Sequence, residues 1–139
     1  MNGTVAGEKR ASVLLVEDEP DICDLAAEAL TEQGFDVQAV LTASEALSRL
    51  NSGTPIDVLF TDVNLAGGMD GAVLAQRARE LHPGLPIMYT SGKRASIEHL
   101  DPVEGSMFVP KPYNPFSLGP LLEYLVAARK ICASSRMFR

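Results

Sequence analysis

Candidate chemistry in this chain comes from polar side chains at the ends of short apolar runs. The clearest case is Asp62, which closes the run that begins with Val58. Four further residues follow other apolar runs in the same way: Glu17, Asp18, Ser91 and Lys111. Carboxylates in one crevice repel each other unless a cation lies among them. Their hard oxygen atoms suit Mg²⁺, and a lysine with a hydroxyl opposite the metal offers the positive charge and the donor that a phosphoryl group needs.

Three of these positions also have plain structural readings. Asp62 could cap the turn after it, because aspartate favours turn starts. The acidic run from Glu17 to Glu19 could interact with the dipole of a helix that begins at Pro20. Lys111 could lay its stem along apolar surface and keep its charge in water. A joint chemical role is the better reading only if the fold brings these residues together.

The elements that must position them alternate between strand and helix patterns. Apolar runs predict strands at residues 12–16, 35–40, 58–62, 86–91 and 106–110. Between them, helical spacing predicts helices from Pro20 to Gly34, over 43–51 after a capping box, and over 72–82. A fourth helix within 93–101 is short or irregular because Pro102 follows it, and a last helix carries Leu118 to Leu125.

This alternation predicts an α/β fold with a doubly wound, five-stranded parallel sheet flanked by helices. Right-handed crossovers keep the strands parallel, so their carboxyl ends meet at one edge of the sheet. We expect one domain over residues 12–128, with a flexible lead at 1–11 and a C-terminal tail at 129–139. We expect no linker to a second domain and no effector domain after the last helix.

Composition narrows the function classes. The chain has 139 residues, 46% of them hydrophobic, and a net charge of -6, which disfavours direct binding to nucleic acid. No apolar stretch approaches the roughly 20 residues of a membrane span, and the N-terminus lacks the apolar core of a secretory signal. We therefore expect a cytoplasmic protein without membrane contact. Cys23 and Cys132 are expected to be reduced thiols rather than a disulfide.

Four motifs in order resemble the receiver domains of two-component response regulators, over about residues 12–128: LLVEDEP, FTDVNL, YTSGK and VPKPY. The resemblance implies a flavodoxin-like receiver fold in which Asp62 accepts a phosphoryl group from a histidine kinase or histidine phosphotransferase. It implies that Glu17 and Asp18 hold Mg²⁺ together with Asp62, and that the backbone carbonyl of Asn64 completes the metal shell. Lys111 would bridge to the phosphate.

The resemblance also implies a switch, in which a hydroxyl follows the phosphate and an aromatic side chain repacks. Phe108 matches the aromatic position. Ser91 and Thr90 compete for the hydroxyl role, and counting from Pro86 favours Ser91 because small Gly92 then occupies the next place. The chain departs from the family pattern in its longer loop after Asp62, with two glycines at 67–68, and in Pro110 on the fifth strand.

The sequence leaves two rival functions open, and two ways in which the domain could pass its signal to a partner protein. An aspartyl-phosphate hydrolase would need an acid/base carboxylate where Asn64 stands, so we expect no dedicated enzyme, only self-catalysed phosphorylation and dephosphorylation. A phosphorylation-independent binding module would lack the acceptor or the lysine, and both are present. The signal is expected to reach an unidentified downstream protein through the surface near Phe108, Tyr113 and Tyr124. The alternative is a phosphate shuttle that docks a histidine phosphotransferase around Asp62 and the first helix.

Overall fold

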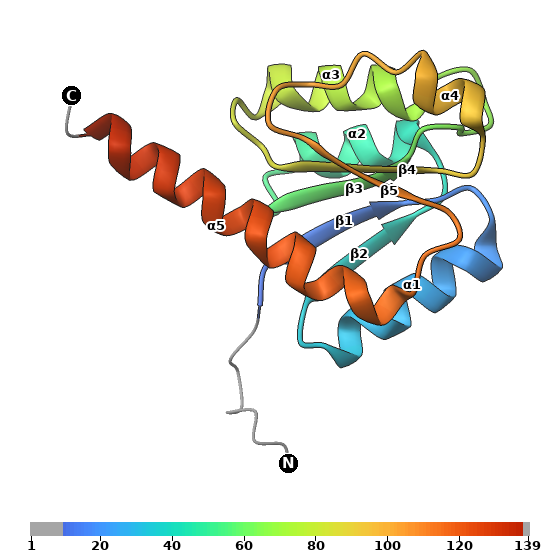
Figure 1. Cartoon of the computed structure of the whole chain (residues 1–139), viewed down its shortest axis with the longest axis horizontal. Coiled ribbons are helices and arrows are strands. Elements are labelled where there is room, and N and C mark those ends of the chain that lie inside the picture. The colour runs from blue at the N-terminus through green and yellow to red at the C-terminus, as the bar shows by residue number, and fades with distance from the viewer. Residues whose placement is uncertain (1–9, 138–139) are drawn as a thin grey trace.

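The computed structural model describes residues 10–137 and shows a parallel sheet between two layers of helices (Figure 1). Its elements, in chain order, are β1 (Ser12–Val16), α1 (Pro20–Glu32), β2 (Asp36–Val40), α2 (Ala43–Asn51), β3 (Val58–Asp62), α3 (Gly71–Leu81), β4 (Ile87–Ser91), α4 (Arg94–Glu98), β5 (Met107–Pro110), the 3₁₀ helix η1 (Pro115–Ser117) and α5 (Leu118–Met137). The strand order is β2-β1-β3-β4-β5, with every pair parallel. The predicted fold class is confirmed.

Alternate side chains of the strands supply two apolar cores, one on each face of the sheet. One core joins the sheet to α2 and α3 and includes Leu59 and Leu74, whereas the other joins it to α1 and α5 and includes Phe60 and Leu122. All five residues of β3 are buried, because the strand lies in the middle of the sheet and is covered on both faces. The strand that ends in Asp62 is therefore held rigidly from both sides.

The two edge strands behave as their sequences predict. β2 is only partly covered: its first four residues are exposed or half-buried, and only Val40 is buried. β5 tolerates Pro110 because an edge strand has only one neighbouring strand to bond with. Pro110 stays in register with Ser91 of β4, and the N–H of the next residue, Lys111, donates to Ser91 O at 3.0 Å. The chain therefore delivers Lys111 to the carboxyl edge of the sheet despite the proline.

The helices near the C-terminus agree in part with those predicted from the sequence. α4 has five residues, which confirms the short fourth helix. α5 begins at Leu118, because η1 precedes it and Gly119 and Pro120 fall in its first turn, where proline costs little. The expected tail at 129–139 is helical over 129–137, since no glycine or proline follows Pro120, and this part of α5 projects beyond the sheet (Figure 1).

Two further expectations concern the lead and the membrane. Residues 1–9 of the expected lead lie outside the described residues, whereas Arg10 is anchored, with its N–H donating to Gly34 O at 3.0 Å and its side chain 3.2 Å from Glu123. Over residues 10–137, no helix has the length and apolar character needed to cross a membrane.

Candidate functional site

The predicted chemical residues meet at the carboxyl edge of the sheet. Glu17 and Asp18 follow β1, Asp62 ends β3, Ser91 ends β4 and Lys111 follows β5. These four strands are consecutive in the sheet, so their ends lie side by side. The convergence that the sequence could only suggest is therefore present in the structure.

Lys111 joins the two most buried carboxylates of this edge. Its Nζ lies 2.7 Å from Asp62 Oδ2 and 2.8 Å from Glu17 Oε1. Glu17 is 1% exposed and Asp62 is 5% exposed, so this ion pair is shielded from water on the carboxylate side. Lys111 therefore reaches into the edge rather than out along the surface, which removes the plain structural reading of this residue.

The protonation of this cluster reflects burial and pairing together. Burial is the main cause that raises the pKa of Glu17 above its ordinary value, and the bond with Lys111 opposes this rise. Burial alone would lower the pKa of Lys111, but its bonds with Asp62 and Glu17 outweigh burial and raise the net pKa. The lysine therefore stays charged wherever the protein is folded at ordinary pH, and it supplies a fixed positive charge beside Asp62.

The three carboxylates also fit a divalent cation. One oxygen each from Glu17, Asp18 and Asp62 lies within 4.8 Å of the other two. Backbone N–H groups orient two of these side chains: Ala66 donates to Asp18 Oδ2 at 3.1 Å, and Asn64 donates to Asp62 Oδ1 at 2.9 Å. One lysine offers a single positive charge to three carboxyl groups, and each of these groups has lone pairs beyond these contacts. Oxygen ligands with remaining negative charge are a donor set that suits Mg²⁺.

Ser91 and Thr90 lie on opposite faces of β4, as neighbouring strand residues do. Ser91 Oγ accepts from Asn64 Nδ2 at 2.7 Å and from Lys93 N at 3.1 Å, which places its hydroxyl with the loop that follows Asp62. Thr90 is buried, and its Oγ1 has no hydrogen-bond partner among the described residues. The structure brings Ser91 to the edge and leaves Thr90 in the interior, although the backbone carbonyl of Thr90 accepts from Val63 N at 2.9 Å.

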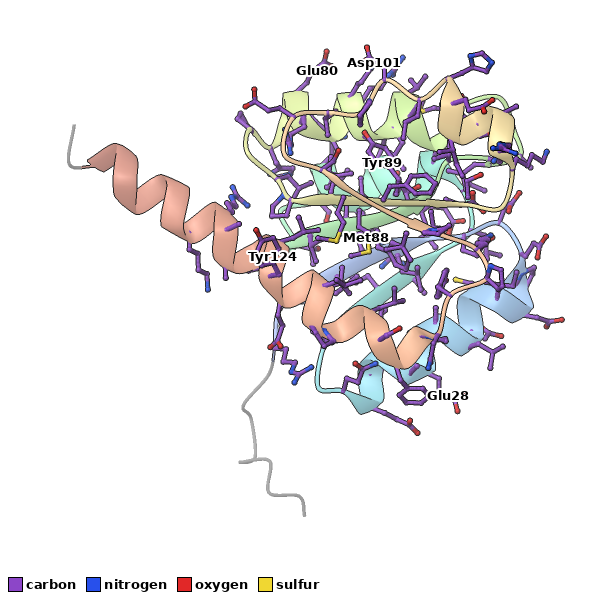
Figure 2. The ribbon with its side chains drawn as sticks, in the orientation of Figure 1. Glu28, Glu80, Met88, Tyr89, Asp101 and Tyr124 are labelled. Atoms are coloured by element: carbon purple, nitrogen blue, oxygen red, sulfur yellow. The ribbon has the colours of Figure 1, made fainter. Side chains whose placement is uncertain are left out.

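Phe108 lies further from this edge, on the α2 and α3 face of the sheet. It is half-buried against that core and stands opposite Tyr89 in the register of β4 and β5. Tyr89 lies between the sheet and α3 (Figure 2), and its hydroxyl accepts from Val103 N at 3.0 Å, just before β5. Phe108 and Tyr89 thus connect the strands beside Ser91 to the segment that follows α4.

Gly71 is a residue of this site that sequence reasoning missed. Its N–H donates to Val63 O at 2.8 Å, and a Cβ built on it would overlap the carbonyl oxygen of Asp62 and lie 2.8 Å from the carbonyl carbon. Only glycine lets the chain pass so close behind the strand that carries Asp62. A weak signal was present, because Asp70 caps α3 through a 2.9 Å bond from Val73 N and glycine is a poor helix former to place directly after a cap.

The fold and the residues at this edge of the sheet define a class: a doubly wound α/β domain with a cluster of carboxylates and a lysine at the carboxyl ends of its strands. A family model described as "Response regulator receiver domain" matches residues 13–122. The chain belongs to this family, whose members are the receiver domains of two-component systems. The recognition of the family from the four sequence motifs is confirmed.

Individual relatives agree with this assignment. The chain is 30% identical to the transcriptional regulatory protein CreB of Escherichia coli K12, over 77% of this chain and 47% of that protein. It is 31% identical to the transcriptional regulatory protein TcrA of Mycobacterium tuberculosis H37Rv, over 81% of this chain and 43% of that protein. The chain thus spans less than half the length of these two curated relatives.

A solved structure is similar over nearly its whole length. The crystal structure of a response regulator receiver protein from Sinorhizobium medicae WSM419 superposes with a TM-score of 0.79 at 34% identity. The match covers 86% of this chain and 96% of that chain.

Proposed function

We propose that this domain is a phosphoacceptor in which Asp62 takes a phosphoryl group from a histidine kinase or a histidine phosphotransferase, with Mg²⁺ bound. The observation that carries the proposal is the position of Lys111 Nζ, 2.7 Å from Asp62 and 2.8 Å from Glu17, which are both buried. A phosphoryl group on Asp62 brings new negative charge to that point, and a preorganised ammonium stabilises such charge.

The chemical step needs little from the protein beyond positioning and charge. One oxygen of the Asp62 carboxylate forms a bond to phosphorus while the bond between phosphorus and the donor imidazole nitrogen breaks. The electron pair of the broken bond returns to the imidazole, which recovers a proton from water. Hydrolysis of the aspartyl phosphate by water later returns the free carboxylate, so the domain acts on its own phosphoryl group and is not a dedicated enzyme.

The metal would be held by carboxylate oxygens of Glu17, Asp18 and Asp62, and the backbone carbonyl of Asn64 would complete the set, as the family resemblance implies. Bound Mg²⁺ supplies charge neutralisation for the phosphoryl oxygens. Residues of this chain do the remaining work: Asn64 N fixes Asp62 Oδ1, Ala66 N fixes Asp18 Oδ2, and Lys111 holds Asp62 Oδ2.

The switch that follows would use Ser91 rather than Thr90, because Ser91 is the hydroxyl at the acceptor edge. A phosphoryl group on Asp62 would draw the Ser91 hydroxyl toward it and let Phe108 pack further inward. Such a change shifts the balance between two existing conformations and builds no new fold.

Beryllofluoride, which mimics a phosphoryl group, should bind this site only in the presence of Mg²⁺. Amide NMR shifts are expected at Asp62 and, because the switch extends from it, also at Ser91, Gly92 and Phe108. The Asp62→Asn variant is the control, and its amide shifts should show no saturable change when beryllofluoride is added. Shifts confined to Asp62 and its immediate neighbours would reject the switch, and binding that survives removal of Mg²⁺ would reject the metal assignment.

Two surfaces are available for partner proteins. Tyr124, labelled on α5 in Figure 2, is 66% exposed, whereas Leu118, Leu122 and Leu125 of the same helix are buried, so Tyr124 suits the expected output face. Tyr113 does not join that surface, because its ring packs against Phe60 with 5.7 Å between the ring centroids. The output face proposed for an unidentified downstream protein therefore rests on Tyr124, because Phe108 is half-buried on the α2 and α3 side of the sheet and α5 covers the other side.

A groove of about 520 Å³ beside Lys111 supports the alternative route. It lies between α1 and the segment after β5 and is lined by Ile22, Leu25, Gly92, Lys111, Pro112, Tyr113 and Pro115. Leu25, which is part of this lining, is 64% exposed. An apolar groove next to the acceptor suits the protein that carries the phosphohistidine, whether it donates the phosphoryl group or receives it back.

Separate variants distinguish the two surfaces. In a pull-down with beryllofluoride-activated protein, Tyr124→Ala should lose the downstream partner and Leu25→Arg should lose the histidine-bearing partner. Thr31→Arg, an exposed change on α1 outside the groove lining that adds the same single positive charge, is the matched control. Loss of every partner from Leu25→Arg, with Tyr124→Ala unaffected, would reject the output face and leave a phosphate shuttle.

A further inference from the structure

The short helix α4 is tied to the acceptor edge by one side chain. Of its five residues only Ser96 is half-buried, and the other four are exposed. The Ser96 hydroxyl donates to Asn64 Oδ1 at 2.8 Å. A helix of this length gains little from its own backbone hydrogen bonds, and this one buries no apolar side chain. The hydrogen bond from Ser96 is therefore the side-chain contact that joins α4 itself to the site, whereas Leu100, just after the helix, packs against the core.

Asn64 uses the other end of the same side chain to hold the switch hydroxyl. Its Nδ2 donates to Ser91 Oγ at 2.7 Å, while Lys93 N donates to the same oxygen at 3.1 Å. A serine hydroxyl has two lone pairs and one hydrogen. Both lone pairs of Ser91 are thus occupied, and its hydrogen is left to donate to a phosphoryl oxygen.

We propose that Ser96, acting through Asn64, is a positioning residue that keeps Ser91 and α4 together in the unphosphorylated arrangement. This inference rests on the proposed function of Asp62. When Ser91 moves toward a phosphoryl group on Asp62, it leaves Asn64 Nδ2, and the amide is then free to turn away from Ser96. Release of the switch hydroxyl and release of α4 are therefore parts of one transition.

Thermodynamic linkage makes the coupling between release of α4 and binding at Asp62 measurable. If a phosphoryl mimic favours the released α4, then releasing α4 by mutation must tighten binding of that mimic by the same factor. Ser96→Ala removes the hydrogen bond and Ser96→Thr keeps a hydroxyl at the same position. Ser48→Ala, on the exposed face of α2, is the matched serine control.

The test combines hydrogen exchange of the α4 backbone with beryllofluoride affinity in the presence of Mg²⁺. Without beryllofluoride, the amides of Ile97 and His99 should exchange about five-fold faster in Ser96→Ala, as expected for loss of one hydrogen bond. Beryllofluoride should bind this variant tighter by a similar factor. Ser96→Thr and Ser48→Ala should both resemble the wild-type protein. Alanine is a better helix former than serine, so if Ser96→Ala changed only the helix propensity of α4, hydrogen exchange would become slower instead.

Two results would overturn the inference. One is exchange in Ser96→Ala that is unchanged or slower, which would mean that Ser96 does not hold α4. The other is faster exchange with unchanged beryllofluoride affinity, which would mean that α4 and the acceptor site are not coupled. Failure of the wild-type protein to bind beryllofluoride would instead reject the role of Asp62, so the two failures are distinguishable.

Discussion

Replacing Lys111 with alanine should lower the free energy of unfolding at pH 7 by about 2 kcal/mol in the absence of Mg²⁺. The lysine is the cation that neutralises Glu17 and Asp62, which are both buried. Without it, two buried carboxylates face each other with little access to water. Chemical denaturation of both proteins measures the difference, and added Mg²⁺ should reduce it because a divalent cation takes over the neutralisation.

The pH dependence of this loss has a definite sign. The bond with Lys111 is one of the contacts that keep the pKa of Glu17 from rising further under burial. In the Lys111→Ala variant the pKa of folded Glu17 should be higher still. A carboxyl whose pKa is raised by folding contributes stability at low pH, and this stability is lost as pH rises through the folded-state pKa. The stability deficit of the variant should therefore be small near pH 4.5, the ordinary value for this carboxyl, and larger at neutral pH.

At the alkaline end the two proteins should converge. The pKa of Lys111 is raised in the folded protein above its ordinary value of 10.5, so its contribution is complete below that pH and declines as pH rises through the higher folded-state pKa. Lys93→Ala, which removes an exposed lysine from the loop before α4, is the control and should change stability little. A Lys111 variant as stable as the wild-type protein at pH 7 without Mg²⁺ would contradict this electrostatic account.

A methyl group on Gly71 should disturb the acceptor strand directly. The new Cβ of Gly71→Ala would overlap the carbonyl oxygen of Asp62 and lie 2.9 Å from Val63 Cα. These are backbone atoms of a strand that is buried on both faces, so they cannot move aside without moving the acceptor. We expect a loss of about 3 kcal/mol in the free energy of unfolding and weaker beryllofluoride binding in the fraction that folds.

Gly92→Ala is the matched control for this prediction. Its new Cβ would come no closer than 3.5 Å to Lys111 Cβ, which is ordinary contact. It should therefore keep nearly the stability of the wild-type protein. Equal stability of the two alanine variants would show that the approach of Gly71 to Asp62 is not a constraint on this fold.

Much of the fold could be predicted because its signals are local. The apolar run that ends in Asp62 has no polar alternation, and a strand buried on both faces is what such a run predicts. The predicted start of α2 is present, with Thr42 as N-cap: Glu45 N donates to Thr42 Oγ1 at 3.1 Å, and the Thr42 hydroxyl donates to Glu45 Oε1 at 3.3 Å. Once the strands are parallel, the meeting of Glu17, Asp62 and Lys111 follows from topology alone.

The rest depends on contacts between distant segments. Asn64 was expected to contribute a backbone carbonyl, and nothing in the sequence shows that its side chain links Ser91 to Ser96. Gly71 resembles any loop glycine until the carbonyl of Asp62 lies behind it. Tyr113 was expected near the output face, but its half-buried ring packs against Phe60 and lines the groove beside Lys111. Side-chain partners of this kind are set by tertiary packing.

Incubation with acetyl phosphate and Mg²⁺, followed by intact-protein mass spectrometry, tests the central claim most directly. The wild-type protein should gain one acid-labile phosphoryl group, and chelation of Mg²⁺ or the Asp62→Asn change should abolish it. Borohydride reduction, which converts an aspartyl phosphate to homoserine, should place the modification on the peptide that contains Asp62. Phosphoryl labelling that persists in Asp62→Asn, or that maps to a peptide without Asp62, would contradict the assignment of Asp62 as the acceptor.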